Sequence, residues 1–146
     1  VGDLIAVQPF GNRLTLLDVT GAELRETFEI ALADAPAENG GFLQVSAGVE
    51  LVYDSRKPVG ERVITLKIAQ EGAMQSIDPD RTYTIATNNF TAAGGDSHSV
   101  LGAVYDDGRN TIVGNTDWEM LRDHMVERKE VFYQVEGRIV DVAQQD

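Results

Sequence analysis

Hydrophobic positions recur at two spacings along this chain, and each spacing predicts a different kind of element. In residues 21–33 the apolar side chains return every four positions, which is typical of one face of an α-helix. The stripe consists of Leu24, Phe28 and Leu32, and the charged residues Glu23, Arg25, Glu26 and Glu29 are expected mostly on the outer face. In residues 49–54 and 62–68 apolar and polar side chains alternate, which is typical of half-buried strands. These patterns predict a helix with Phe28 in the core and two adjacent antiparallel strands.

Two short sequences mark the beginnings of helices. Thr20-Gly21-Ala22-Glu23 and Thr116-Asp117-Trp118-Glu119 each place a threonine three positions before a glutamate. This is the capping-box pattern, in which the two side chains bond free amides at a helix start. The first helix is expected from Gly21 to about Ala33, and the second is expected to end near Arg128. The apolar residues expected on the inward side of the second helix are Trp118, Leu121 and Met125.

Other apolar stretches predict further strands and short helices. Strands are expected at residues 13–19, 42–46, 81–87 and 137–142, and the end of a helix is expected at residues 3–7. A short helix is expected to begin near Asp96. Because strands outnumber helices and several are joined by short turns, the sequence predicts the α+β class. The expected architecture is a single domain over residues 1–146, with a mixed or mostly antiparallel sheet and flanking helices.

The composition excludes several classes of protein. Of the 146 residues, 24 are acidic and 12 are basic, which gives a formal net charge of −12 at pH 7. This charge would repel a phosphate backbone, so nucleic-acid binding is not expected. No apolar run approaches the roughly 20 residues that cross a bilayer, so no membrane span is expected. The chain has no cysteine, which excludes disulfides and thiolate metal sites.

Residues capable of hydrolytic chemistry are few. The two histidines are His98 and His124, and no cluster of acidic residues with histidine has the spacing of a two-metal site. Ser97 and Ser99 lack the strand-turn-helix signature of a nucleophile elbow. We expect His98 to be a solvent-facing neighbour of a binding site and His124 to be an ordinary helix residue. The sequence therefore predicts no catalytic residue and no metal site in this chain.

Two segments have the chemistry of a nucleoside clamp. Asn88-Asn89-Phe90-Thr91-Ala92-Ala93-Gly94-Gly95-Asp96 combines an aromatic ring, a double-glycine turn and a carboxylate. Pro9-Phe10-Gly11-Asn12 supplies a second aromatic ring. A double glycine permits positive φ angles and the close approach of a ligand to the backbone. The two rings would stack on a base, and the carboxylate would accept hydrogen bonds from hydroxyl groups.

Each of these residues also has an ordinary structural interpretation. On chemistry alone, Phe10 and Phe90 would more often be core residues, and Asp96 would be a turn or helix-cap residue. Asn12 and Asn89 could contact a base edge, but turns are the favoured interpretation for both.

The two segments occur in a fixed order with Gly41-Phe42-Leu43-Gln44-Val45-Ser46 and with Val135-Glu136-Gly137-Arg138-Ile139. With these landmarks the chain resembles the C-terminal domain of the 5'-nucleotidase family, from about Asp3 to Val142. The resemblance implies that Phe10 and Phe90 sandwich the base and that Asp96 binds the ribose hydroxyls, all facing one cleft. The substrate-binding residues that it implies are Phe10, Phe90, Asp96, Gly94, Gly95 and Asn89.

The resemblance also implies a partner domain. In this family an N-terminal metallophosphoesterase domain holds two divalent metal ions, and the polypeptide is exported. That domain is expected to be absent from this chain, which would make the isolated chain catalytically inactive. A family segment of the type Asn-Gly-Gly-x-Arg, which contacts phosphate and base, is expected upstream of Val1. Ser97-His98-Ser99 stands where many relatives have a glycine and an aromatic residue.

Several functions fit this resemblance. The leading hypothesis is the nucleoside-binding domain of an enzyme that hydrolyses nucleotide phosphate esters. Alternative substrates within the family are UDP-sugars, 2',3'-cyclic nucleotides and 3'-nucleotides. A different alternative is a noncatalytic nucleoside-binding or interaction module.

Overall fold

The computed structural model describes residues 2–145, so Val1 and Asp146, at the ends of the expected domain, lie outside the described residues. In chain order the helices are α1 (Gly2–Val7), α2 (Gly21–Ala31), α3 (Asn89–Ala92), α4 (Ser99–Asp106) and α5 (Asp117–Arg128), with short 3-10 helices η1 (Gly95–Ser97) and η2 (Val142–Gln144). The strands are β1 (Arg13–Thr20), β2 (Val49–Tyr53), β3 (Val63–Gln70), β4 (Ala73–Ser76), β5 (Thr82–Asn88), β6 (Asn110–Thr116) and β7 (Ile139–Asp141). This arrangement confirms the predicted α+β class.

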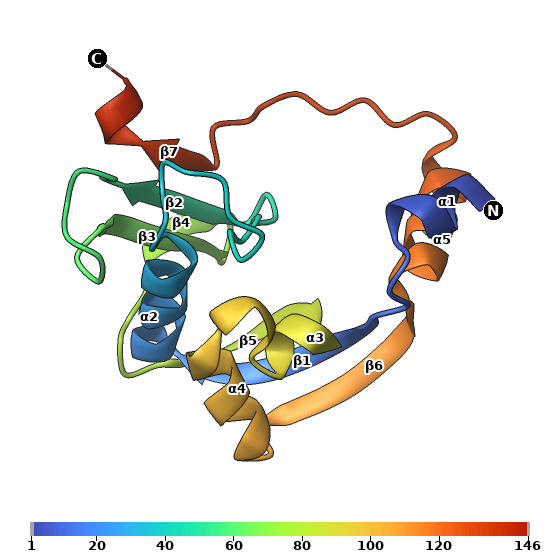
Figure 1. Ribbon diagram of the computed structural model, residues 1–146, viewed down its shortest axis with the longest axis horizontal. Coiled ribbons are helices and arrows are strands. Elements are labelled where there is room, and N and C mark those ends of the chain that lie inside the picture. The colour runs from blue at the N-terminus through green and yellow to red at the C-terminus, as the bar shows by residue number, and fades with distance from the viewer. Residues whose placement is uncertain (1, 146) are drawn as a thin grey trace.

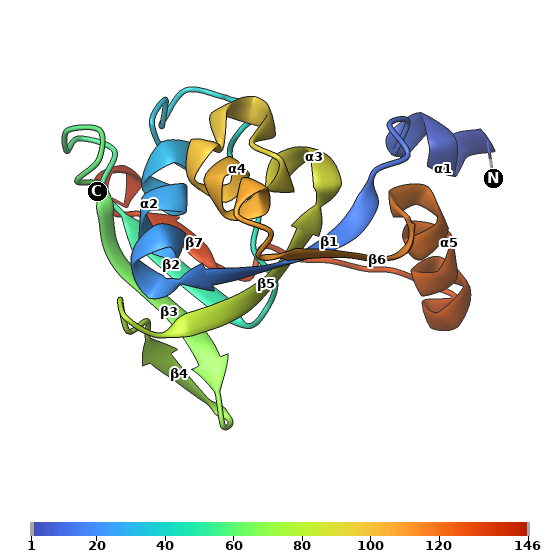
Figure 2. The same cartoon turned by 90° about the horizontal axis from the view of Figure 1, so that it is seen from below.

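One sheet is antiparallel throughout and has the strand order β5-β1-β6. Alternate side chains of β1 point to one face, where Thr15, Leu17 and Val19 are fully buried. Three helices, α2, α3 and α4, lie on this face (Figures 1 and 2). The sheet therefore fixes the place where β5 ends and α3 begins.

A second sheet has the strand order β4-β3-β2-β7. Its pairs are antiparallel except for β2 and β7, which run parallel with Leu51 opposite Ile139. The helix α2 contacts both β1 and β3, so it connects the two sheets. The stripe residues Leu24 and Phe28 of α2, and Leu32 directly after it, are buried in the core, as the four-residue spacing predicts.

Glu29 differs from the prediction, because it is buried rather than on the outer face of α2, with 7% of its surface exposed. Its carboxylate accepts hydrogen bonds from the backbone amides of Arg62 and Val63, both at 2.8 Å. These amides belong to the first residue of β3 and to the residue before it, both distant from Glu29 in sequence. A carboxylate with two backbone donors is satisfied inside the protein, so this glutamate joins the helix to the second sheet.

Residues 42–46 were predicted to form a strand, and this prediction is wrong. Phe42, Leu43 and Val45 do pack against the core, which explains the apolar pattern. Among the described residues, no backbone ladder forms beside this segment. Instead, the Arg138 guanidinium donates a hydrogen bond to the Val45 carbonyl oxygen at 2.5 Å.

The strands β4 and β6 were not predicted. β4 is only four residues long, and β6 is rich in polar residues and contains Gly114 at a φ of 73°. Neither strand has the clear alternation of a half-buried strand, and most of their residues are exposed or partly exposed. Their strand conformation depends on pairing with β3 and β1.

The helix α5 begins at the predicted capping box, but its apolar residues do not face the core. No described residue of α5 is buried, and Met125 is 44% exposed. The helix lies beyond the end of β6 and packs against the short α1 (Figures 1 and 2). The Arg122 guanidinium lies over the Trp118 ring at 5.6 Å, so this ring is covered from its own helix rather than by the core.

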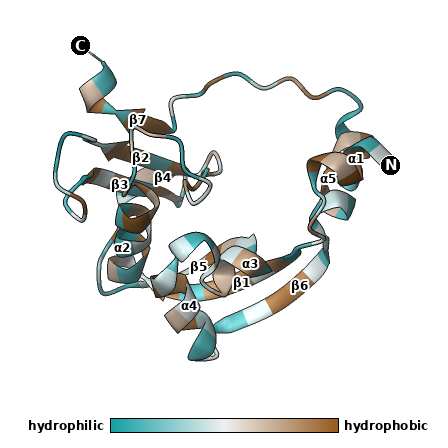
Figure 3. Ribbon diagram, in the orientation of Figure 1, coloured by the Kyte–Doolittle hydropathy of each residue, from teal (hydrophilic) through white to brown (hydrophobic). Residues whose placement is uncertain are grey.

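The segment between α5 and β7 is a long irregular connection that arches away from the sheets in Figure 1. Hydrophobic and hydrophilic residues alternate along it in Figure 3, and its Phe132, Tyr133 and Val135 are exposed.

Within residues 2–145, no helix combines the length and the apolar character needed to cross a membrane.

Candidate functional site

Phe90 lies at the junction of β5 and α3, where the strand ends and the chain turns. The Asn88 side chain caps α3 by accepting a hydrogen bond from the Thr91 amide at 2.8 Å. This cap fixes the direction of the first turn of α3, which carries Phe90. Phe90 is 50% exposed, although its neighbour Thr91 is buried and large aromatic residues are more often inside a protein.

Gly95 lies against the Phe90 ring. A Cβ atom at position 95 would lie 2.5–2.6 Å from three carbon atoms of this ring, closer than van der Waals contact allows. The preceding Gly94 has a φ of 90°, and a Cβ there would lie 3.3 Å from the Cα of Gly102. The double glycine therefore has two separate roles: Gly94 makes the left-handed turn, and Gly95 gives space to the ring.

Phe10 lies in the turn between α1 and β1 and is 81% exposed. The turn continues through Gly11, which has a φ of 63°. Two residues later, the Arg13 amide donates a hydrogen bond to the Asn89 side-chain oxygen at 2.5 Å. The turn that carries Phe10 is thereby connected to the residue directly before Phe90.

The hydrogen bonds of Asn12 and of the Asn89 side chain join distant parts of the chain and do not close local turns, which differs from the favoured interpretation. The Asn12 backbone amide donates a hydrogen bond to the Asp117 carboxylate at 3.1 Å, and the Asn12 backbone carbonyl accepts one from the Asp117 backbone amide at 2.7 Å. Asn89 uses its side-chain oxygen for Arg13. Both asparagines therefore anchor the start of β1 to neighbouring elements.

Asp96 follows the double glycine with an exposed side chain and a backbone in the left-handed region, at φ 52° and ψ 38°. Its carboxylate makes no hydrogen bond or ion pair with any other residue of the range 2–145. It does not cap η1 or α4, so the helix-cap interpretation is wrong for this side chain. The carboxylate is therefore free to accept hydrogen bonds from a ligand.

A cavity of about 310 Å³ lies beside Asp96. Its lining residues come from the end of α2, from the loop after α2 and from residues 94–98, which we call the Asp96 turn. They are Ile30, Ala33, Asp34, Asn39, Gly40, Gly41, Asp96 and Ser97. Neither Phe10 nor Phe90 lines this cavity. The expectation that the two rings and the carboxylate face one cleft stays a prediction.

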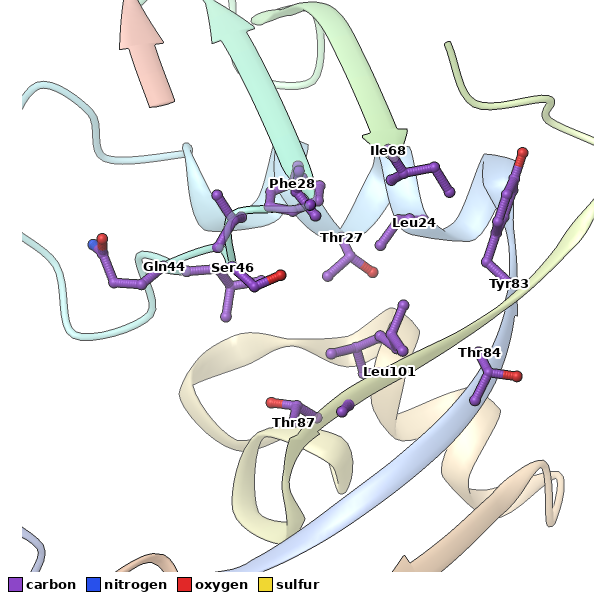
Figure 4. Close-up of a pocket in the computed structure, with 16 residues that line it drawn as sticks. Leu24, Thr27, Phe28, Gln44, Ser46, Ile68, Tyr83, Thr84, Thr87 and Leu101 are labelled. Atoms are coloured by element: carbon purple, nitrogen blue, oxygen red, sulfur yellow. The ribbon is translucent and has the colours of Figure 1, made fainter. Parts of the chain in front are cut away.

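A second cavity, of about 430 Å³, lies between the two sheets. In Figure 4, Leu24, Thr27 and Phe28 of α2 border it on one side, and Leu101 of α4 and Thr87 of β5 border it on the other. Its lining is mostly apolar and includes none of the expected substrate-binding residues. This cavity belongs to the gap between the sheets and not to the Asp96 turn.

His98 is not solvent-facing, because only 1% of its surface is exposed. Its Nε2 atom lies 2.9 Å from the Gly41 carbonyl oxygen. The chain folds back after Asp96, which turns the imidazole inward against the loop that follows α2. The sequence offered no signal for this contact, since 57 residues separate the two partners.

Among the described residues, no group of three His, Asp or Glu side chains is placed to hold a metal ion. His124 is a partly buried residue of α5, and its Nε2 atom is 2.8 Å from the Tyr133 hydroxyl. This contact ties α5 to the connection that follows it. The geometry thus offers exposed aromatic rings and a free carboxylate.

Comparison with known proteins shows the family to which this chain belongs. A family model described as "5'-nucleotidase, C-terminal domain" matches residues 1–103. The trifunctional nucleotide phosphoesterase protein YfkN of Bacillus subtilis (strain 168) is 35% identical over 144 residues, which cover 97% of this chain and 10% of that protein. The snake venom 5'-nucleotidase of Crotalus adamanteus is 35% identical over 143 residues, covering 94% of this chain and 24% of that protein.

A solved structure has the same fold. The crystal structure of a 5'-nucleotidase precursor from Thermus thermophilus superposes with a TM-score of 0.90 and 34% sequence identity. The match covers 98% of this chain and 28% of that chain. The chain therefore spans only 10% to 28% of the lengths of these three proteins.

Proposed function

The chain belongs to the family of 5'-nucleotidase C-terminal domains, and from this premise we propose that it is the nucleoside-binding domain of an enzyme that hydrolyses nucleotide phosphate esters. In this proposal Phe10 and Phe90 stack on the two sides of the base, and Asp96 accepts hydrogen bonds from the ribose hydroxyls. Gly94, Gly95 and Asn89 shape the site. The whole of residues 1–146 forms this one domain.

The observation that carries the proposal is the contact between Phe90 and Gly95, directly beside the free Asp96 carboxylate. Phe90 keeps half of its surface exposed beside this contact, and in the proposal a base stacks on the exposed part of the ring. Stacking of a base on an aromatic side chain contributes about 1–3 kcal/mol, by analogy with single-stranded nucleic acids. A carboxylate one residue further along the chain can accept two hydrogen bonds from vicinal hydroxyls, and such charge-assisted bonds are stronger than neutral ones.

The catalytic step belongs to a partner domain in this proposal. A metallophosphoesterase domain of the same polypeptide would hold two divalent metal ions, which would supply an activated water for attack on phosphorus. The residues of this chain would hold the nucleoside so that its phosphate ester reaches that water. The isolated chain is then inactive, because its contribution is binding and orientation.

Export is part of the proposal. One relative is, by its name, a venom enzyme, which supports a polypeptide that acts outside the cytoplasm. Extracellular nucleotides are substrates that such an enzyme would meet after export.

A second candidate function keeps the site and changes the ester. The name of the Bacillus subtilis relative assigns it three functions on nucleotide phosphoesters, which favours a site that accepts more than one ester. UDP-sugars, 2',3'-cyclic nucleotides and 3'-nucleotides are the alternative substrates. A noncatalytic nucleoside-binding module is the remaining alternative, and it would be favoured by a parent polypeptide without a metal-binding domain.

The proposal is tested by assaying the parent polypeptide that carries this chain. We expect it to release phosphate from AMP in the presence of divalent metal ions, and we expect the 146-residue chain alone to release none. UDP-glucose and 2',3'-cyclic AMP distinguish the alternative substrates. A parent polypeptide that binds adenosine but cleaves none of these esters would favour the noncatalytic module.

A further inference from the structure

His98 is a buried histidine two residues after the proposed ribose-binding carboxylate. Its side chain and its backbone both make hydrogen bonds in this turn. The Nε2 atom lies 2.9 Å from the Gly41 carbonyl oxygen, the His98 amide donates to the Gly95 carbonyl at 3.2 Å, and the His98 carbonyl accepts from the Gly102 amide at 3.0 Å. One residue thus connects the Asp96 turn to α4 and to the loop after α2.

The imidazole must carry its proton on Nε2 to make the Gly41 contact, because a carbonyl oxygen only accepts hydrogen bonds. The other ring nitrogen, Nδ1, is buried and has no hydrogen-bond partner among the described residues. The histidine therefore has one directional interaction through its side chain, and that interaction is aimed at the backbone of Gly41.

The Asp96 turn needs hydrogen bonds to its surroundings because its backbone is in an unfavourable conformation. Asp96 has a φ of 52° and Ser97 a φ of 70°, so two consecutive residues with side chains occupy the left-handed region. Residues other than glycine rarely adopt this region, and a run of two persists only where the surroundings hold it. The Asp96 carboxylate has no partner of its own in residues 2–145, so its position depends on this backbone.

Gly41 completes the connection to Asp96. A Cβ atom at position 41 would lie 2.8 Å from the Asp96 carbonyl oxygen and 3.5 Å from the Asp96 Cβ. The Gly41 amide donates to the Asn39 side-chain oxygen at 2.6 Å, which holds the loop in this approach. The residue that His98 bonds is therefore the same residue that packs on the backbone of Asp96.

From this arrangement we infer that His98 is a positioning residue that holds the Asp96 carboxylate in the orientation needed to bind ribose hydroxyls. The inference rests on the proposed function of Asp96. His98 acts through Gly41 and the turn, and it does not contact the ligand. Removing its Nε2 donor releases the turn, which weakens recognition of the hydroxyls but leaves base stacking in place.

The test compares adenosine with 2',3'-dideoxyadenosine, which lacks both hydroxyls. Affinities are measured by calorimetry or NMR titration for the wild type, His98→Leu, His98→Gln and the control His124→Leu. His98→Leu keeps an apolar volume without a donor, and His98→Gln keeps an N–H donor on a side chain of similar reach. We expect His98→Leu to weaken adenosine about tenfold, as for the loss of a charge-assisted hydrogen bond, with dideoxyadenosine unchanged.

In His98→Gln and His124→Leu we expect adenosine binding close to that of the wild type. Should His98→Leu not fold, Gly41→Ala disturbs the next contact in the same connection, between Gly41 and the Asp96 backbone, and should lose the same discrimination. A folded His98→Leu or Gly41→Ala variant that still prefers adenosine by the wild-type ratio would overturn the inference. A wild-type chain that binds both nucleosides equally would instead show that Asp96 does not bind ribose, and the proposed function of that residue would fail with the inference.

Discussion

At the scale of single residues, the candidate site depends on contacts that only glycine permits. The Phe90 ring rests on Gly95, and the Asp96 backbone is approached by Gly41. A side chain at position 95 would displace the ring, and a side chain at position 41 would displace the Asp96 backbone. Sequence alone identifies the double glycine and its neighbours, but it does not show that one glycine makes the turn and the other makes room for a ring.

Replacing Gly95 with alanine tests the seat of the Phe90 ring. The new Cβ would lie 2.5–2.6 Å from ring carbons, so the ring must move. We expect Gly95→Ala to fold and to weaken adenosine binding by about 1–2 kcal/mol, since stacking on a displaced ring is partly lost. Gly2→Ala is the matched control, because a Cβ built there would meet no described residue within 4 Å apart from its neighbours in the chain and its own helix backbone. Unchanged binding in a folded Gly95→Ala chain would show that the Phe90 ring is not a base platform.

Replacing Asp96 with alanine tests the ribose contact. The carboxylate has no partner among the described residues, so its removal breaks no hydrogen bond or ion pair, and the expected loss of stability is the strain of an alanine at a φ of 52°. We expect Asp96→Ala to weaken adenosine about tenfold, as expected when charge-assisted hydrogen bonds are lost, and to leave free adenine unaffected. Isothermal titration with both ligands measures the difference, and Asp106→Ala, another exposed aspartate, is the control. Equal losses for nucleoside and base would contradict the ribose assignment.

At the scale of elements, local signals correctly predict where helices begin, and contacts distant in sequence decide what those signals also do. The capping box at Thr20 is present as predicted, with the Glu23 amide 3.2 Å from the Thr20 hydroxyl. The same Glu23 carboxylate also accepts two hydrogen bonds from Arg109, at 2.7 Å and 3.0 Å. This second role could not be predicted, because 86 residues separate the partners.

The Glu23 contacts predict a dependence of stability on pH. Hydrogen bonds from Arg109, and further bonds from Thr20, lower the pKa of Glu23 from 4.5 to about 2, against the opposing effect of partial burial. Because the pKa is lower in the folded state, the stabilisation is fully present above the unfolded pKa of 4.5 and is lost as the pH falls towards 2. We expect Glu23→Gln to lower the free energy of unfolding by about 1 kcal/mol at pH 7, since the pair is partly exposed.

Urea denaturation at pH 7, 4 and 2.5 measures this dependence. The difference between the wild type and Glu23→Gln should shrink as the pH falls, and Glu26→Gln, on the exposed face of the same helix, should show no such trend. A difference of the same size at all three pH values would mean that the Glu23 carboxylate does not supply the stabilisation.

At the scale of the whole molecule, two sheets are connected through α2, and distant parts of the chain are joined by strand pairs that sequence periodicity cannot reveal. The β2 and β7 strands pair in parallel although their residues, such as Leu51 and Ile139, are far apart in the chain. The apolar segment at residues 42–46 has the composition of a strand but pairs with none in the described part of the chain. Periodicity reports burial, and burial alone does not decide whether a backbone enters a ladder.

The whole molecule also leaves apolar surface exposed, along α1, α5 and the connection to β7. The prediction that one side of α5 faces the core is wrong, because this helix lies beyond the end of β6 and none of its described residues is buried (Figure 2).

The chain spans 28% of the matched Thermus thermophilus structure. Of the residues proposed to bind a nucleoside, Phe10 lies in the turn before β1, Phe90 in α3 directly after β5, and Asp96 in η1. All three lie outside the strands, in connecting segments of the kind that often carry ligand-binding residues.

The central claim is that this chain binds a nucleoside through Phe10, Phe90 and Asp96, and an NMR titration tests it most directly. Amide shifts of the chain are recorded during titration with adenosine at millimolar concentration, with the Phe10→Ala/Phe90→Ala double variant as the control. We expect saturable shifts at Phe10, Phe90 and Asp96 that disappear in the control. A folded wild-type chain with no saturable shift at these residues would contradict the claim.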